Sequence, residues 1–182
     1  MSLTESILKS CIHELNVCQH LYTKFDPTNA DWRPQANMRS TVELLQYLSY
    51  IGIATAKHFV NPPEDREAAR EQYREQAKWS VEAVTFENAS EMIELEKDAL
   101  RNLFSTITDD DLQRTTYHMF SNQEMSLFEA LTNAVMKYLC AYRMQLFLYA
   151  KMCGAEINTR NNWYGMDSQR PAPVPETVAA VA

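Results

Sequence analysis

Apolar residues recur every three or four positions along four stretches of the chain, which is the pattern of helices with a buried face. The first stretch is residues 3–25. Ser2 and Glu5 can form a capping box at its start, and the sequence Asp26-Pro27 ends it, because the residue before proline avoids helical backbone angles. The pattern therefore predicts that the chain begins with a core helix.

Two further stretches carry the same helical spacing. One begins at Ser40, which can pair with Glu43 in a second capping box, and continues to Asn61, where two prolines follow. The other is residues 89–107, with Asn88 as its expected cap. We expect both stretches to form uninterrupted helices of the core.

The longest stretch is residues 126–154, which contains no Pro or Gly before its last residue. Ser126 and Glu129 match a capping box, and Gly154 can end the helix in a left-handed conformation. About 27 helical residues would span roughly 40 Å. One face of this helix would hold Leu127, Leu131, Ala134, Tyr138, Tyr142, Gln145 and Tyr149. A neighbouring face is also apolar, so we predict that this helix is the central member of a bundle.

The segments between the core helices are polar. Residues 64–78 are dense in both charge signs and predict a solvated peripheral helix. Residues 28–39 form a connection in which Trp32 is expected to cover one end of the bundle, and residues 113–124 are expected to be irregular. The predicted fold is all-α, an up-down four-helix bundle with an extra charged peripheral helix.

The chain is predicted to form one domain over residues 1–165, followed by a flexible tail over residues 166–182. Residues 155–165 are expected to form a loop over the bundle mouth that carries Trp163. The low glycine content, 3 residues in 182, supports helices over a turn-rich β fold.

Charge and hydropathy exclude several function classes. The net charge is −7 and Lys and Arg do not cluster, which argues against a nucleic-acid partner. No apolar run approaches the length of about 18 residues needed to span a membrane, and no secretory signal is present, so we expect a cytoplasmic protein. The four cysteines form no CxxC pair and are expected to be buried, reduced thiols.

Three short motifs resemble the DinB/YfiT-like proteins. They are MRSTVELLQYL at residues 38–48, YRMQL at residues 142–146 followed by Gly154, and Trp32-Arg33-Pro34 in the connection. The resemblance covers residues 3–154. It implies a four-helix bundle, commonly a homodimer, with a divalent metal held by three histidines. Members of that family include thiol-dependent S-transferases and a mycothiol-dependent isomerase.

In this sequence the three expected metal-binding histidines are replaced by tyrosines. The resemblance places the ligand positions at Tyr47, Tyr138 and Tyr142, while Gln145 keeps the family's residue and Met144 stands where the family has glycine. A phenol has a pKa of about 10 and binds a divalent ion poorly until it loses its proton. We therefore expect neither a metal nor another cofactor, although three phenolates could in principle hold ferric iron.

Two arrangements of the three tyrosines remain open at this point. They can fill the former metal cavity with their rings, or they can line a polar pocket that binds a small organic molecule. Gln145, His58 and Trp163 are candidate neighbours of that pocket. Each histidine of the chain is expected at the surface or at an edge, yet His58 or His118 could act as a general base if it faced the pocket.

The sequence therefore supports three functional hypotheses. The first is a metal-free DinB-like bundle that binds a small molecule or acts as a structural or interaction protein. The alternative is a small-molecule enzyme of the thiol-dependent S-transferase kind, with a relocated metal or none. The third is an oligomer, expected from the resemblance to be a homodimer, whose work is done at its surface.

Overall fold

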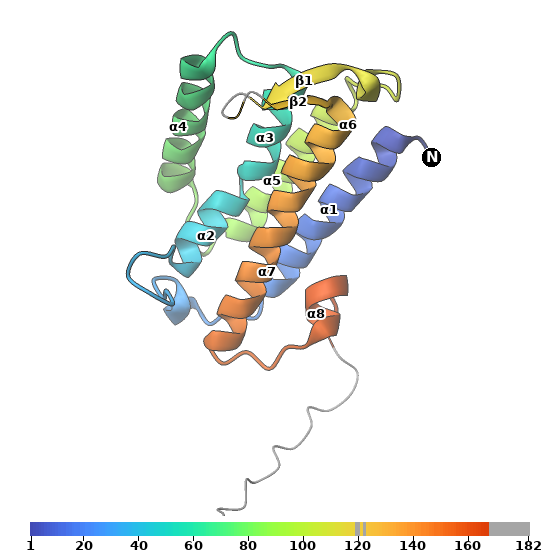
Figure 1. Cartoon of the computed structure of the whole chain (residues 1–182). Helices are drawn as coiled ribbons and strands as arrows, with labels where there is room; N and C mark the ends of the chain where they lie inside the picture. Colours follow the sequence, from blue (N-terminus) through green and yellow to red (C-terminus); the bar gives the residue numbers. More distant parts are fainter. Residues whose placement is uncertain (119–120, 122, 168–182) are drawn as a thin grey trace, which may run out of the picture.

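The computed structural model describes residues 1–118, 121 and 123–167 (Figure 1). Its helices are α1 (Leu3–Tyr22), α2 (Thr41–Leu48), α3 (Ile51–Val60), α4 (Arg66–Ala83), α5 (Ala89–Phe104), α6 (Leu127–Ala130), α7 (Lys137–Met152) and α8 (Thr159–Tyr164). Two short 3-10 helices, η1 (Pro27–Asn29) and η2 (Asp111–Gln113), lie in the connections. Strands β1 (Thr115–His118) and β2 (Gln123–Ser126) form a hairpin.

Four helical columns form the bundle, as the sequence predicts. They are α1, α2 with α3, α5, and α6 with α7, and α1 packs against both α5 and α7. Helix α4 stands beside the bundle along α2 and α3, so the charged peripheral helix is also present (Figure 1). The core runs along the centre and contains fully buried leucines from every column, such as Leu15, Leu45, Leu100 and Leu146.

Local capping signals set the helix starts. Ser2 with Glu5, Ser40 with Glu43, and Ser126 with Glu129 all form capping boxes. Asn88 is the N-cap residue of α5, as predicted, but its side chain makes no capping bond to the helix. The Asn88 amide donates to the Ala83 carbonyl instead, and its side-chain oxygen accepts from the Thr85 N–H.

The second core helix is broken, contrary to the prediction. Helix α2 ends at Leu48, with Ser49 as its C-cap, and α3 starts after Tyr50, whose backbone leaves the helical region. The cause is a side chain of another helix: Glu96 Oε1 of α5 accepts hydrogen bonds from the N–H groups of Gly52 (2.7 Å) and Ile53 (3.1 Å). These N–H groups are the orphan donors of a helix start, so a distant carboxyl group supplies the cap.

The long helix follows its predicted course but not as a uniform α-helix. A π-helical segment, η3 (Leu131–Met136), separates α6 from α7. In a π-helix the hydrogen bonds run over one more residue, which widens the turn and rotates the following side chains about the helix axis. The Thr132 hydroxyl also donates to the Phe128 carbonyl at the start of this segment. The rotation takes effect just before Tyr138.

Two connections differ from the expectation. Residues 115–118 and 123–126 form an antiparallel hairpin in which Thr115 pairs with Ser126, because two threonines and a tyrosine in a row suit a strand. The segment after Gly154 contains helix α8, which lies beside α1 rather than forming a loop over the mouth (Figure 1).

Polar contacts fasten α8 to the bundle. Arg143 of α7, which is buried, forms an ion pair with Glu14 of α1. It also donates to the carbonyl oxygen (2.7 Å) and the side-chain oxygen (2.6 Å) of Asn162. Asp167 pairs at 2.6 Å with Lys24, which follows the end of α1. The rest of the predicted tail, residues 168–182, lies outside the described residues.

The cysteines match the prediction in part. Cys11 and Cys18 are buried, whereas Cys140 and Cys153 are half-buried, and all four are free thiols. Burial raises the pKa of Cys11 to about 12, so this thiol stays protonated at neutral pH. Over the described part of the chain, no helix combines the length and the apolar character that a membrane span requires.

Candidate functional site

The three tyrosines singled out by the resemblance line one cleft. The cleft has a volume of about 430 Å³ and lies between α2, α3 and α7 on one side and α4 on the other. We call it the tyrosine cleft. Its lining consists of Tyr47, Ile51, Thr55, His58, Phe59, Arg70, Tyr73, Arg74, Tyr138 and Tyr142.

Aromatic packing fixes two of these rings. The rings of Tyr47 and Tyr142 meet at a centroid distance of 4.7 Å and an angle of 63°, and Tyr50 contacts Tyr47 from the other side at 5.4 Å. The guanidinium carbon of Arg39 lies 4.1 Å from the Tyr47 ring centroid, a cation–π contact. These contacts hold the two phenols at the wall of the cleft and leave space beside them.

Two phenols of the cleft, those of Tyr47 and Tyr73, have a raised pKa. Burial raises the pKa of Tyr47, and the neighbouring Tyr142 raises it further. Burial also raises the pKa of Tyr73, although a hydrogen bond with Thr55 partly offsets the effect. A phenol that resists ionisation is a poor ligand for a divalent cation. The donor set at Tyr47, Tyr138 and Tyr142 therefore does not fit the metal that the resemblance implies.

No other metal site replaces it among the residues that the structure places. There, no group of three or more His, Cys, Asp or Glu side chains lies close enough to hold an ion.

His58 lies in the tyrosine cleft, which corrects the prediction of a surface or edge position. Its residue is only 4% exposed. Its ring packs edge-on against Phe59 at a centroid distance of 5.1 Å and lies 6.1 Å from the Tyr73 ring. The Tyr73 hydroxyl in turn donates to Thr55 Oγ1 at 3.5 Å. The imidazole of His58 and the hydroxyl of Thr55, both on α3, thus lie near the phenol of Tyr73 on α4.

The other two candidate neighbours lie elsewhere. Gln145 donates to the Tyr149 hydroxyl (2.7 Å), which donates to the Arg39 carbonyl (3.0 Å). Gln145 therefore positions the segment that carries Arg39 and does not line the cleft. Trp163 is 51% exposed on α8, under the Arg143 guanidinium at 4.9 Å. Its predicted place at the pocket is wrong, because α8 docks on α1.

Sequence reasoning missed the wall that α4 provides. Arg70, Tyr73 and Arg74 come from the charged stretch that was predicted to be only solvated. Ala69 and Tyr73, four residues apart, are the signal that this helix has an inward face, and Ala69 is fully buried. Arg74 is held by Glu67 (3.1 Å) and Glu71 (3.0 Å), both on its own helix.

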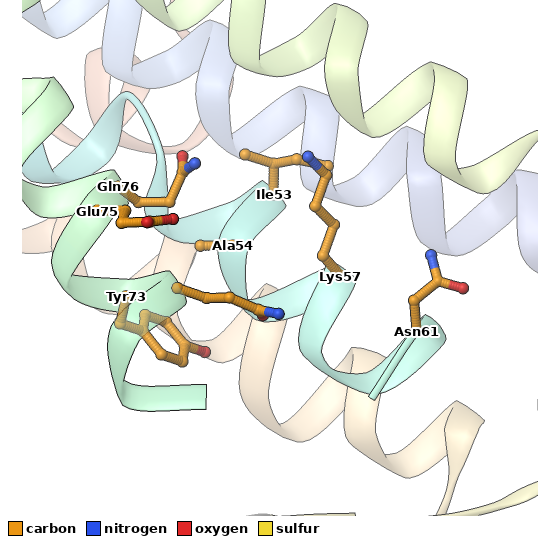
Figure 2. A pocket seen from close by; sticks show the side chains of 8 residues that line it. Ile53, Ala54, Lys57, Asn61, Tyr73, Glu75 and Gln76 are labelled. Carbon is orange, nitrogen blue, oxygen red and sulfur yellow. The ribbon is translucent and has the colours of Figure 1, made fainter. Parts of the chain in front are cut away.

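A second cavity lies on the other side of Tyr73. It has a volume of about 290 Å³ and is lined by Ile53, Ala54, Lys57 and Asn61 of α3 and by Gln72, Tyr73, Glu75 and Gln76 of α4 (Figure 2). In Figure 2 the α3 side chains and the α4 side chains line opposite sides of this space. Tyr73 is therefore a common wall of both cavities.

Comparison with known proteins identifies the architecture. No family model matches the sequence, and no curated protein matches it. Among solved structures, the DinB-like protein YjoA of Bacillus subtilis superposes with a TM-score of 0.60 over 84% of this chain and 94% of that chain. The chain has a DinB-like fold. The sequence identity is 14%, so the likeness concerns the fold alone. It confirms the DinB-like bundle that the short motifs predict.

Proposed function

We propose that this DinB-like protein binds a small organic molecule in the tyrosine cleft and that no divalent metal takes part. The observation that carries the proposal is that Tyr47, Tyr138 and Tyr142 border a space of about 430 Å³. Pockets for small ligands typically measure roughly 300–1,000 Å³ and combine apolar walls with a few polar groups. Here Ile51 and Phe59 supply apolar surface beside the hydroxyls.

The lining favours a flat molecule with a hydrogen-bond acceptor. Aromatic rings prefer edge-to-face contacts with a further ring, which Tyr142 and Tyr138 can offer. Arg70 and Arg74 supply N–H donors and positive charge at the α4 wall. A ring-bearing carboxylate combines both features, since guanidinium groups pair well with carboxylates.

Benzoate is a suitable first probe, titrated by calorimetry or followed by ligand-detected NMR. Tyr142→Leu removes a ring from the cleft and should weaken binding about three- to tenfold, because an aromatic pair is worth roughly 0.5–1.5 kcal/mol. Tyr164→Leu is the matched control on exposed α8 and should leave binding unchanged. Equal binding by both variants would place the probe elsewhere and contradict the proposal.

The metal-free character needs its own measurement. Protein purified without a tag or a metal column should contain close to no metal by mass spectrometry. If the protein contains a stoichiometric metal that Tyr142→Phe releases, a phenolate is a ligand. The proposal that no divalent metal takes part would then be wrong.

A second candidate function is catalysis on a small molecule, as in the thiol-dependent S-transferases. The position of His58 in the tyrosine cleft supports it, because an imidazole can accept the proton of a thiol at neutral pH. Alkylation of an added low-molecular-weight thiol by a bromobimane probe should then be faster with the protein than without it. His58→Gln should remove the acceleration and His13→Gln should not. An equal rate in all samples rules out this candidate.

The homodimer that the resemblance implies is also a proposal for this chain. Sedimentation at several protein concentrations would test it, and a monomer at all of them would reject it.

A further inference from the structure

Glu96 is a buried carboxyl group with only half of its hydrogen bonds made. It is 2% exposed and inserts from α5 into the break between α2 and α3. Oε1 accepts from Gly52 and Ile53, whereas Oε2 has no hydrogen-bond partner within the described part of the chain. Buried polar atoms nearly always have a partner, so this atom indicates a missing hydrogen-bond partner.

The same side chain lines a cavity. This cavity, which we call the Glu96 pocket, has a volume of about 270 Å³ and lies between α3, α4 and α5. Its lining consists of Ser49, Ile53, Lys57, Gln76, Trp79, Leu95, Glu96 and Ala99. It shares no residue with the tyrosine cleft, but it shares Ile53, Lys57 and Gln76 with the cavity of Figure 2.

The other walls indicate what kind of donor would fit. Ile53, Leu95 and Ala99 are apolar, and Trp79 presents an indole ring, which is the best side chain for a cation–π contact. The only carboxyl group in the lining is Glu96, and no metal-binding cluster occurs over the described residues. A carboxylate oxygen beside an indole and apolar side chains suits an organic cation better than a metal ion.

We propose that the Glu96 pocket binds a small primary ammonium compound whose N–H group donates to Glu96 Oε2. The alkyl part lies against Leu95 and Ala99, and the charged end lies near Trp79. This site is separate from the tyrosine cleft and does not depend on the function proposed there.

Lys57 is the internal competitor for this site. It lines the pocket from α3, and its side chain is exposed and forms no ion pair with Glu96 in the described structure. Its ammonium group has the same chemistry as the proposed ligand and repels it. Removing that charge should therefore strengthen binding of an added ammonium compound.

Protonation provides an independent signature. Burial raises the pKa of Glu96 to about 8, so the carboxyl group carries a proton at neutral pH when no cation is bound. The other titratable groups near it are Lys57 of α3, Tyr50 before α3, and Cys11 and Cys18 of α1. Binding of a cation should ionise Glu96 and release about one proton, most of it to the buffer at pH 7.

The test is calorimetric titration of the full chain with n-butylammonium chloride, with n-butanol as the uncharged probe. Glu96→Gln keeps an acceptor for Gly52 and Ile53 and should weaken ammonium binding by about tenfold or more. Glu91→Gln is the same substitution at an exposed position of α5 and should have no effect. Lys57→Gln should bind more tightly than the wild type.

Three outcomes would overturn the proposal. They are equal binding of n-butanol and n-butylammonium, equal binding by the wild type and Glu96→Gln, and no binding by the wild type, in which case water partners Oε2. If Glu96→Gln fails to fold, the comparison of n-butylammonium with n-butanol on the wild type still tests the proposal. The binding heat at pH 7 should vary with the ionisation enthalpy of the buffer, and an invariant heat would contradict proton release.

Discussion

Buried charged groups are fully paired on one side of this bundle, whereas cavities remain on the other side. On the side of α1, α5 and α7, Lys97 is buried with partners at Asn16 (2.8 Å), Gln19 (2.7 Å) and Glu94. Arg143 is likewise buried, and its guanidinium group contacts Glu14, Asn162 and the ring of Trp163. On the side of α4, three cavities remain under one helix.

The difference follows from what each helix brings to the contact. Helices α1, α5 and α7 bury leucines, while α4 buries only Ala69 and Ser80. Small and polar side chains cannot fill the space opposite α2 and α3, and little apolar area holds α4 in place. One side of the bundle is therefore closely packed, and the other side retains the open space that the proposed ligands would occupy.

Breaking the polar contacts of the tight side should have the largest effect. Arg143→Ala leaves Glu14 without its partner and frees Asn162, so the free energy of unfolding should fall by about 3–5 kcal/mol. Chemical denaturation measures this change. Arg101→Ala, which removes exposed ion pairs with Glu94 and Asp98, should cost less than about 1 kcal/mol. Similar losses in both variants would mean that burial does not strengthen the contacts of Arg143.

Glu96 should make the stability of the α4 side depend on pH. The folded pKa is raised to about 8 from the ordinary value of 4.5, so the folded state holds a proton that the unfolded state has lost. Its stabilising contribution is complete below pH 4.5 and is lost as the pH rises to about 8, by at most roughly 1.4 kcal/mol per unit.

The measurement is a set of denaturation curves from pH 6 to pH 8.5 for the wild type and Glu96→Gln. Their difference removes the opposite contribution of His20, whose pKa is lowered by burial and by Lys24. A pH-independent difference would mean that Glu96 does not titrate in this range.

Adding a methyl group at Gly52, at the break between α2 and α3, should lower the free energy of unfolding by an intermediate amount. A Cβ atom at Gly52 would lie 2.7 Å from Glu96 Oε1, so Gly52→Ala forces the carboxyl group away from its two N–H donors. We expect a loss of about 1–3 kcal/mol in the free energy of unfolding. In a double-mutant cycle, Gly52→Ala should cost much less in a Glu96→Ala background. Strict additivity would contradict the steric explanation.

The smallest effect is expected on the outer surface of α4. Arg74→Ala removes ion pairs that lie in solvent, so stability should change by less than about 0.5 kcal/mol. Benzoate binding should nevertheless weaken if Arg74 faces the ligand in the tyrosine cleft. Lys78→Ala, on the same helix and outside that cleft, should change neither quantity.

The sequence allowed prediction of what depends on neighbouring residues. Capping boxes at Ser2, Ser40 and Ser126 require partners three residues away, and all three are present. The break before α3 was missed because its cause, Glu96, is 44 positions from Gly52. The residues around Gly52 contain no pattern that predicts a cap supplied by another helix.

The candidate site was predicted to a similar extent. The resemblance brought Tyr47, Tyr138 and Tyr142 together, and of the candidate neighbours the structure places His58 beside them. The α4 wall was missed because Arg70 and Tyr73 lie in a stretch whose charge suggested full solvation. Trp163 was misplaced because the docking of α8 depends on Arg143, a charged residue that sequence reasoning left without a role.

The helix break also gives the tyrosine cleft two independently anchored walls. Tyr47 belongs to α2, whereas His58 belongs to α3, and α3 takes its start from a side chain of α5. We expect a change in the side-chain length of residue 96 to shift α3 relative to α2, which is capped separately by Ser40 and Glu43. The width of the cleft can therefore be altered from the opposite face of the bundle, without replacing any residue that lines it.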